Sequence, residues 1–288
     1  MATIRSGAPV ARSLASDRKS AFPWLLAVAF ALTLAGSLRV AEVDPRLLVQ
    51  PDALGNVGRF AAGAWPPQLS GEFLGLMARP VAETIQISVT GTVLAVIIGF
   101  PLGILATSTL MWRGVLHERR VQTRRWLLGL PVYTVARALL SMFRAIPEYV
   151  WAFMFVRAVG LGPFPGVLAI GIAYGGMLGK VYSEILESVD PRPLETLQAA
   201  GASRAAVVFY GLVPQALPTF VSYTLYRWEC AIRASAILGF VGAGGLGQQV
   251  ELSMRMFQFD EVLTLLAILF VLVAVVDFIS GRLRARLV

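Results

Sequence analysis

Long apolar stretches are the feature of this sequence that most limits its possible folds. Several of them approach the about 20 residues that a helix needs to cross the about 30 Å hydrocarbon core of a membrane. Only 15% of the residues are charged and 57% are hydrophobic, whereas about 25% of the residues of a soluble domain are charged. The chain therefore lacks the charge for a water-facing surface. We expect an all-α integral membrane protein of about six transmembrane helices.

The apolar stretches alternate with segments rich in Arg and Lys, and this alternation predicts the orientation of the chain. Cytoplasmic loops of membrane proteins carry an excess of these residues, and 1–21, 111–125 and the C-terminal tail are basic here. We therefore expect both termini in the cytoplasm. The expected segments are a cytoplasmic tail at 1–21, a first transmembrane helix at 22–38, an external loop at 39–80, and further spans at 81–110, 130–157, 166–182, 216–238 and 262–281.

Two of these segments need comment. The basic tail followed by the apolar tract 22–38 could also be a signal peptide, but the tract exceeds the usual 7–15 residues and no clear cleavage site follows it, so we favour a retained helix. The span 130–157 contains Pro147. Since proline removes a helix hydrogen bond, we expect a kink or a break there.

Composition also argues against several other classes of protein. The formal net charge of +8 is explained by basic cytoplasmic loops, so we do not expect nucleic-acid binding. Cys230 is the single cysteine and His117 the single histidine, so we expect no internal disulfide, no metal site and no cofactor held by this chain. A membrane-embedded phosphatase or protease needs clustered His and Asp or a Ser–His pair, and His117 stands alone in a basic loop.

The segment 183–214 is an unusual inner loop, because it is predicted to contain a short helix, a turn and a second helix. Asp190, followed by Pro191 and Pro193, can begin the first helix. Gly201 can end it, and Ser203 can cap the next one. The segment is either an ordinary loop or a docking element for a cytoplasmic partner.

A resemblance to a known family favours the docking element. Glu195, Gly201 and Pro214 have the spacing of the E-A-A-x3-G-x9-I-x-L-P loop of binding-protein-dependent ABC transporter permeases. The positions at which this sequence departs from that pattern are Thr196, Leu197, Gly211 and Val213. Together with residues 143–170 and 222–248, the loop resembles the phosphonate-type branch, whose substrates include phosphonates and phosphite. The resemblance covers about residues 80–285.

The resemblance implies a type I ABC importer permease fold, with 81–288 as the permease core and 183–214 as its coupling loop. It implies a multi-pass protein of the bacterial inner membrane that passes a phosphorus oxyanion to the cytoplasm. The implied partners are a second permease subunit, expected to be an identical chain, two ATPase subunits that carry ATP and Mg, and a periplasmic binding protein. The residues that it assigns to coupling with the ATPase are Asp190, Glu195, Ala199, Ala200, Gly201, Ala202 and Pro214.

The sequence agrees with this division of labour, because it contains no phosphate-binding loop of the G-x-x-x-x-G-K-[ST] type. The nearest string, 175–181, has the wrong glycine spacing and ends in Val181. We therefore expect no enzymatic activity in this chain. Two alternatives stay open: an ABC importer permease for another small solute, and an ion-coupled secondary transporter, although such transporters usually contain internal repeats that are not seen here.

Ionisable residues inside predicted spans are candidates for a solute path, since they are costly in lipid and usually face the bundle interior. Glu229 and Arg233 are four residues apart, as are Arg144 and Glu148, so each pair can lie on one helix face. Arg227 lies about 120° from Arg233 around the helix and needs another partner, such as an anion. These residues either neutralise one another or line a path.

The glycine-rich segment 239–247 is the last candidate. Gly242, Gly244 and Gly245 permit tight turns, and their exposed amide groups could face an oxyanion. An ordinary loop after a helix is the alternative. Outside this segment, Glu83 is interpreted as an acid in the first turn of a span, and Arg137 as a residue that reaches the membrane interface.

Overall fold

The computed structural model describes residues 22–41, 50–113 and 123–286, and these are mostly helical, with no strand among them. The expected all-α fold is therefore confirmed. The helices are α1 (Phe22–Val40), α2 (Pro51–Ala64), α3 (Gly71–Leu105), the π-helix η2 (Thr109–Arg113), α4 (Thr123–Ala145), α5 (Glu148–Val159), α6 (Pro163–Ser188), α7 (Pro191–Ala199), α8 (Arg204–Ala206), the π-helix η3 (Val207–Leu212), α9 (Val213–Gly239), α10 (Gly245–Arg255) and α11 (Phe259–Ala285).

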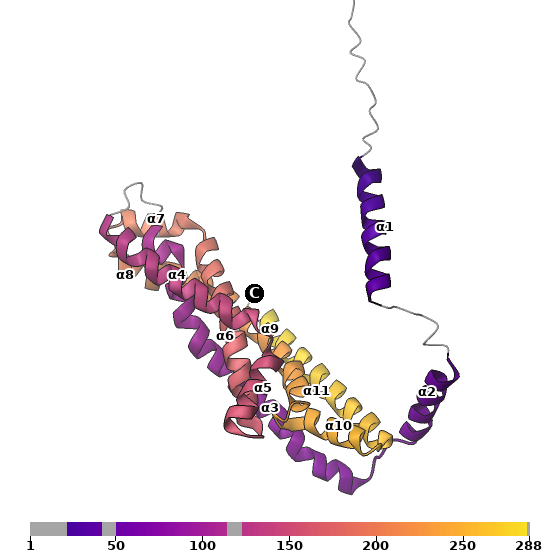
Figure 1. Cartoon of the computed structure of the whole chain (residues 1–288). Coiled ribbons are helices and arrows are strands. Elements are labelled where there is room, and N and C mark those ends of the chain that lie inside the picture. Colours follow the sequence, from indigo (N-terminus) through magenta and orange to yellow (C-terminus); the bar gives the residue numbers. More distant parts are fainter. Residues whose placement is uncertain (1–21, 42–49, 114–122, 287–288) are drawn as a thin grey trace, which may run out of the picture. The chain divides into compact units, whose positions relative to one another are not determined.

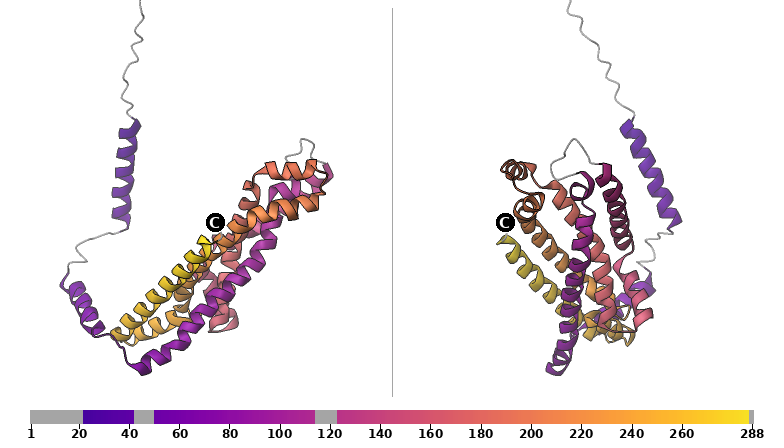
Figure 2. Two further views of the ribbon diagram at one scale, coloured as in Figure 1. Left: turned by 180° about the vertical axis from the view of Figure 1, so that it is seen from behind. Right: turned by 90° about the vertical axis from the view of Figure 1, so that its left-hand side faces the viewer.

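The chain divides into two units, residues 1–59 and 60–288. In the first unit, α1 is an exposed, apolar helix that covers the first predicted span, while the predicted tail at 1–21 lies outside the described residues. The second unit is a helical bundle with α7 and α8 at one end and α10 at the other (Figures 1 and 2). The candidate sites all lie in this second unit.

Four of the described helices are long and apolar enough to cross a membrane: α1, α3, α6 and α11. The helices α4 and α5 make a fifth span if they are counted together, although they are bent by 86° at their junction. Pro147 lies at this junction, so the break that it predicts is confirmed. The remaining predicted span lies in α9, which has 27 residues but carries Arg227, Glu229 and Arg233.

The core of the bundle forms where α3 and α6 lie side by side (Figure 1). Glycines bring the two backbones close together: a Cβ on Gly99 would lie 2.7 Å from the carbonyl oxygen of Gly175, and one on Gly103 would lie 2.8 Å from that of Gly179. Small residues four apart permit this close packing of membrane helices. This contact fixes the position of α6 against α3. The C-terminal end of α6 leads through Val189 and Asp190 into α7.

Several helices extend beyond their predicted limits. The helix α3 begins at Gly71, inside the predicted external loop, because the Ser70 hydroxyl accepts a hydrogen bond from the Phe73 amide and caps the helix there. Pro80 therefore lies within the helix. Residues 248–260, between the predicted spans 216–238 and 262–281, belong largely to α10 and the start of α11.

Candidate coupling element and solute path

The helix α7 has the start and the end that the sequence predicts. The Asp190 carboxylate accepts a hydrogen bond from the Arg192 amide at 3.0 Å, and Pro191 occupies the first helical position. At the other end, Gly201 has φ +86°, a left-handed conformation that favours glycine. The Ala202 amide then donates to the Leu197 carbonyl at 3.1 Å, which closes the helix with a standard glycine cap.

The second helix of the predicted helix–turn–helix is joined directly to α9. The Ser203 hydroxyl accepts a hydrogen bond from the Ala206 amide at 3.3 Å, and α8, η3 and α9 follow without a break. The helix α7 packs against η3 through Leu194, which is 2% exposed. A Cβ on Gly211 would lie 2.6 Å from Leu194 and 2.9 Å from Leu197, so α7 sits where Gly211 leaves room.

The outer side of this element is open. Glu195, Ala199 and Ala200 are exposed, and Phe209 and Tyr210 of η3 are exposed by 69% and 80%. A groove of about 620 Å³ runs beside α7. Its lining residues are Pro193, Thr196, Leu197, Tyr210, Gly211, Pro214 and Gln215. The element therefore presents a mixed polar and aromatic surface that a partner protein can contact.

The partner of Glu229 is different from the one that the sequence suggested. Its carboxylate binds the Arg284 guanidinium of α11 at 2.6 Å, and the Glu229 side chain is only 8% exposed. Arg233 makes no ion pair among the described residues, and its guanidinium contacts the Cys230 sulfur at 3.9 Å. The predicted Glu229–Arg233 pair is wrong because Glu229 faces the neighbouring helix α11, whereas Arg233 points elsewhere.

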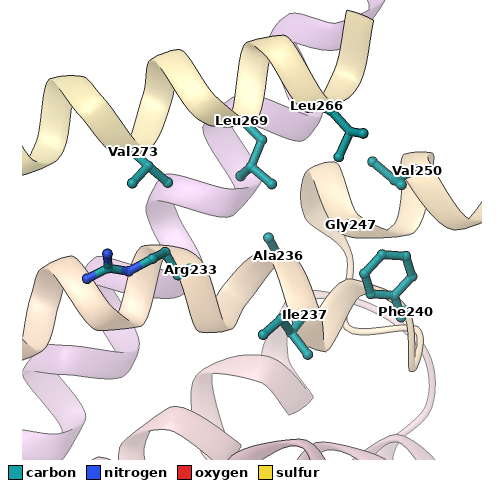
Figure 3. A pocket seen from close by; sticks show the side chains of 9 residues that line it. All are labelled: Arg233, Ala236, Ile237, Phe240, Gly247, Val250, Leu266, Leu269 and Val273. Atoms are coloured by element: carbon teal, nitrogen blue, oxygen red, sulfur yellow. The ribbon is translucent and has the colours of Figure 1, made fainter. Parts of the chain in front are cut away.

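Figure 3 shows where Arg233 lies: at the edge of an apolar cavity of about 280 Å³ between α9, α10 and α11. Arg233 is the one charged residue of its lining, which otherwise consists of Ala236, Ile237, Phe240, Gly247, Val250, Leu266, Leu269 and Val273. Apart from Arg233, the lining offers no polar side chain to a hydrophilic solute. The cavity is therefore a poor candidate for the path of an oxyanion.

The second predicted pair, Arg144 with Glu148, is also absent from the ion pairs of the described chain. Residues four apart meet only on a continuous helix, and the helix breaks between Arg144 at the end of α4 and Glu148 at the start of α5. Arg144 and Glu148 therefore belong to separate helices that meet at the bend of 86°.

The surroundings of Arg227 leave part of its guanidinium without a hydrogen-bond acceptor among the described residues. Its guanidinium lies over the rings of Tyr174 and Tyr223, at 5.2 and 5.7 Å from their centres, and it also contacts the Met177 sulfur. The Nε atom is buried and has no hydrogen-bond partner within the described residues. Aromatic faces stabilise a cation but leave its N–H groups free. Arg227 therefore retains hydrogen-bonding capacity for an anion.

The glycine loop between α9 and α10 adopts the tight turns that the sequence predicts. Gly242, Gly244 and Gly245 have φ values of +91°, +80° and +72°. However, the Gly245 amide donates to the Glu83 carboxylate at 3.2 Å, and the Leu246 amide donates to the Thr84 hydroxyl at 2.8 Å. These two amides are thus already occupied by α3 and are not free for an oxyanion. Glu83 lies within α3 and caps α10, rather than beginning a span.

A charged pair between α4 and α6 was also not predicted from the sequence. Arg137 of α4, expected to reach the membrane interface, instead binds the Glu187 carboxylate of α6 at 3.2 Å. Fifty residues separate the two, and no periodicity or motif links positions at such a distance. An ion pair of this kind, between two helices, can be identified only once the packing of the helices is known.

A family model described as "Binding-protein-dependent transport system inner membrane component" matches residues 127–288, more than half of the chain. The chain belongs to this family. It is a multi-pass transport permease of the inner membrane, and the fold and family predicted from the coupling loop are confirmed.

Two relatives in Stutzerimonas stutzeri resemble the permease over most of its length. The putative phosphite transport system permease protein HtxC is 39% identical over 225 residues, which are 78% of this chain and 73% of that protein. The phosphite transport system permease protein PtxC is 34% identical over 259 residues, 90% of this chain and 87% of that protein. The phosphate-import permease protein PhnE of Mycolicibacterium smegmatis is 35% identical over 72% of this chain and 36% of its own length.

Solved structures support the fold. An inward-facing structure of the MetNI methionine ABC transporter has a chain that matches with a TM-score of 0.62 at 24% identity, covering 76% of this permease and 100% of that chain. An amino acid ABC transporter solved with histidines matches with a TM-score of 0.60 at 17% identity, over 75% of this permease and 95% of that chain. At these identities the likeness concerns the fold alone.

Proposed function

We propose that this permease carries a small phosphorus oxyanion, such as phosphite or a phosphonate, in an ATP-driven importer. The names of the two Stutzerimonas relatives support the solute class, because both are named as phosphite permeases and both match most of the chain. The structural observation that carries the proposal is Arg227, whose buried Nε has no partner among the described residues. A guanidinium forms paired, charge-assisted hydrogen bonds with an oxyanion of this kind.

The position of Arg227 supports a role at the inner end of the path. Glu229, two residues further along α9, is bonded to Arg284 in the last turn of α11. In our proposed orientation this basic end of α11 faces the cytoplasm, as cytoplasmic ends carry Arg and Lys. Arg227 then lies near the inner boundary of the membrane, where water can help to release the solute. Conduction requires such release, so binding must be weak enough to reverse.

The partners proposed for this permease are those of an ABC importer. A second permease chain, identical to this one, would complete the path, and a periplasmic binding protein would deliver the solute. Two separate ATPase subunits would bind ATP and Mg and contact α7 from the cytoplasm. The open groove beside α7, whose lining includes Pro193, Tyr210 and Gln215, supports this contact. In this arrangement the chain itself performs no hydrolysis, and both its termini face the cytoplasm.

Transport by reconstituted complexes tests the proposal. Proteoliposomes that contain the permease, its ATPase and its binding protein should take up phosphite in a manner that requires ATP, and methionine should not compete. Arg227→Ala should lower phosphite uptake about tenfold or more, because a charge-assisted contact contributes about 1.5–3 kcal/mol. Assembly with the ATPase should persist, since Arg227 makes no ion pair in the described part of the chain.

Arg157→Ala serves as the matched control, because Arg157 is an exposed arginine in the last turn of α5 whose guanidinium lies over the Phe153 ring. This variant should transport like the wild-type protein. ATP-driven uptake of methionine in place of phosphite would refute the solute class. Full phosphite uptake by Arg227→Ala would show instead that Arg227 is not part of the path.

A further inference from the structure

Most ion pairs of the described residues stay within one helix, but two cross between helices. The pairs Arg79–Glu83, Lys180–Glu184 and Arg255–Glu251 each join residues four apart. The pairs Arg137–Glu187 and Arg284–Glu229 join different helices. Exposed pairs on one helix contribute little to stability, so the two interhelical pairs are the ones that can fix relative positions.

The Arg137–Glu187 pair lies where three elements meet. One Glu187 oxygen accepts hydrogen bonds from the Ser108 amide at 2.7 Å and from the Arg137 guanidinium at 3.2 Å. Arg137 Nε donates to the carbonyl of Ala106 at 3.0 Å. The pair thus connects α4 and α6 with the junction between α3 and η2. Each half of the pair also satisfies a backbone group that the helix break leaves without a helical partner.

Buried apolar residues adjoin this pair. Beneath it, Ala106, Ala136 and Leu140 form a small buried cluster, all at most 2% exposed. The charged side chains themselves are 25% and 27% exposed, so water reaches them only in part. The carboxylate lies near an amide that begins a helix, and the guanidinium lies near a carbonyl that ends one, which is the favourable arrangement for both helix dipoles.

The Arg137–Glu187 pair lies close to α7 along the chain. Glu187 is in the last turn of α6, three residues before Asp190, the residue that caps α7. Any displacement of α7 by a partner therefore reaches Glu187 before it reaches the rest of α6. Through Glu187 it also reaches α3 and α4, which have no covalent link to α7 nearby.

We infer that the Arg137–Glu187 pair is the joint that makes α7 move together with α3 and α4, and that Glu187 is a positioning residue for coupling ATP hydrolysis to transport. The inference rests on the proposed function of α7 as the contact of the ATPase. Without the joint, a displacement of α7 bends the short link between α6 and α7 instead of moving the bundle. ATP is then hydrolysed with less movement of solute.

Two substitutions test the joint. Glu187→Gln removes the charge but keeps the shape. Arg137→Lys keeps the charge but loses the planar guanidinium, whose Nε bonds Ala106 while a terminal nitrogen bonds Glu187. Both complexes should assemble and hydrolyse ATP at the wild-type rate, while the ratio of phosphite taken up to ATP hydrolysed falls about fivefold or more, the usual size of a coupling between sites. Glu184→Gln is the control, because Glu184 pairs with Lys180 on the same helix.

A second measurement does not depend on the solute. Spin labels on the exposed residues Gln198 of α7 and Val132 of α4, in a Cys230→Ser background, report the distance between these helices with and without bound ATP. In the wild-type complex the distance should stay constant, since the elements move as one. In Glu187→Gln it should change with nucleotide.

The outcomes separate this inference from the proposed function. A wild-type ratio of uptake to hydrolysis in Glu187→Gln, or a distance that changes with ATP in the wild-type complex, overturns the joint. If both variants fail to assemble or melt at a lower temperature, the proposed role in coupling is also overturned, because the pair would then only stabilise the fold. Failure of the wild-type complex to take up phosphite refutes the proposed solute alone, because the distance measurement still tests the joint.

Discussion

Removing Arg284 should destabilise the permease far more than removing Arg233, although the sequence favours Arg233 as the partner of Glu229. In the structure the Glu229 carboxylate, 8% exposed, has Arg284 as its charge partner at 2.6 Å. Loss of one partner from a buried ion pair costs about 3–5 kcal/mol, because the other charge stays buried without compensation. The Arg284 side chain is 30% exposed, so water replaces part of its effect and about 3 kcal/mol is the appropriate estimate.

This free energy can be measured as a melting temperature of the purified permease in detergent. For a chain of this size, about 3 kcal/mol corresponds to a fall of about 6 to 12 °C for Arg284→Ala. Arg233→Ala should change the melting temperature by less than about 2 °C, the effect of a surface substitution, because Arg233 is exposed and its contact is a sulfur at 3.9 Å. The two variants delete the same side chain and differ only in its surroundings.

A third variant shows whether the stranded charge is the cause. In Arg284→Ala, the additional change Glu229→Gln removes the uncompensated charge and should recover most of the lost stability, since a neutral amide is much cheaper to bury. If Arg233→Ala instead lowers the melting temperature as much as Arg284→Ala does, Glu229 pairs with Arg233 in the membrane and the reasoning from the structure is wrong.

Two further predictions concern the coupling element and the orientation of the chain. Gly201→Asn should retain most of the ATPase binding measured by co-purification, whereas Gly201→Val should lose it, because the left-handed φ of +86° is tolerated by Asn but strained for a β-branched residue; equal binding by both variants would contradict this. In a Cys230→Ser background, a membrane-impermeant thiol reagent added from the periplasm should label Gly71→Cys and miss Ala285→Cys, both at exposed positions, and the reverse pattern would invert the proposed topology.

The sequence predicts most reliably those features that depend on neighbouring residues. The ends of α7 follow from Asp190, which offers a side-chain acceptor to the first turn, and from Gly201, which alone adopts the left-handed conformation without strain. The break at Pro147 has the same local origin. These features need no knowledge of what packs against the helix, and the structure contains each of them.

Features that depend on how the helices pack escaped prediction. Residues four apart on a helix are always possible partners, but Glu229 also faces α11, and its carboxylate binds Arg284 of that helix. The Gly245 amide was a candidate contact for an oxyanion, but it and the adjacent Leu246 amide donate to other groups of the protein. Their acceptors, Glu83 and Thr84, lie 162 residues earlier in the chain.

Two departures of the coupling loop from the family pattern are explained by the packing of α7 against η3. In the pattern, alanine stands where this chain has Leu197, and isoleucine stands where it has Gly211. Considered singly, each change weakens the resemblance. In the structure the two positions touch, since a Cβ on Gly211 would lie only 2.9 Å from Leu197 and 2.6 Å from Leu194. The larger side chain on α7 thus occupies space that the smaller residue on η3 vacates, and close-packed interiors tolerate exchanges that conserve volume. The contact between α7 and η3 is therefore preserved even though both of its residues have changed, so these two departures count as one compensated exchange.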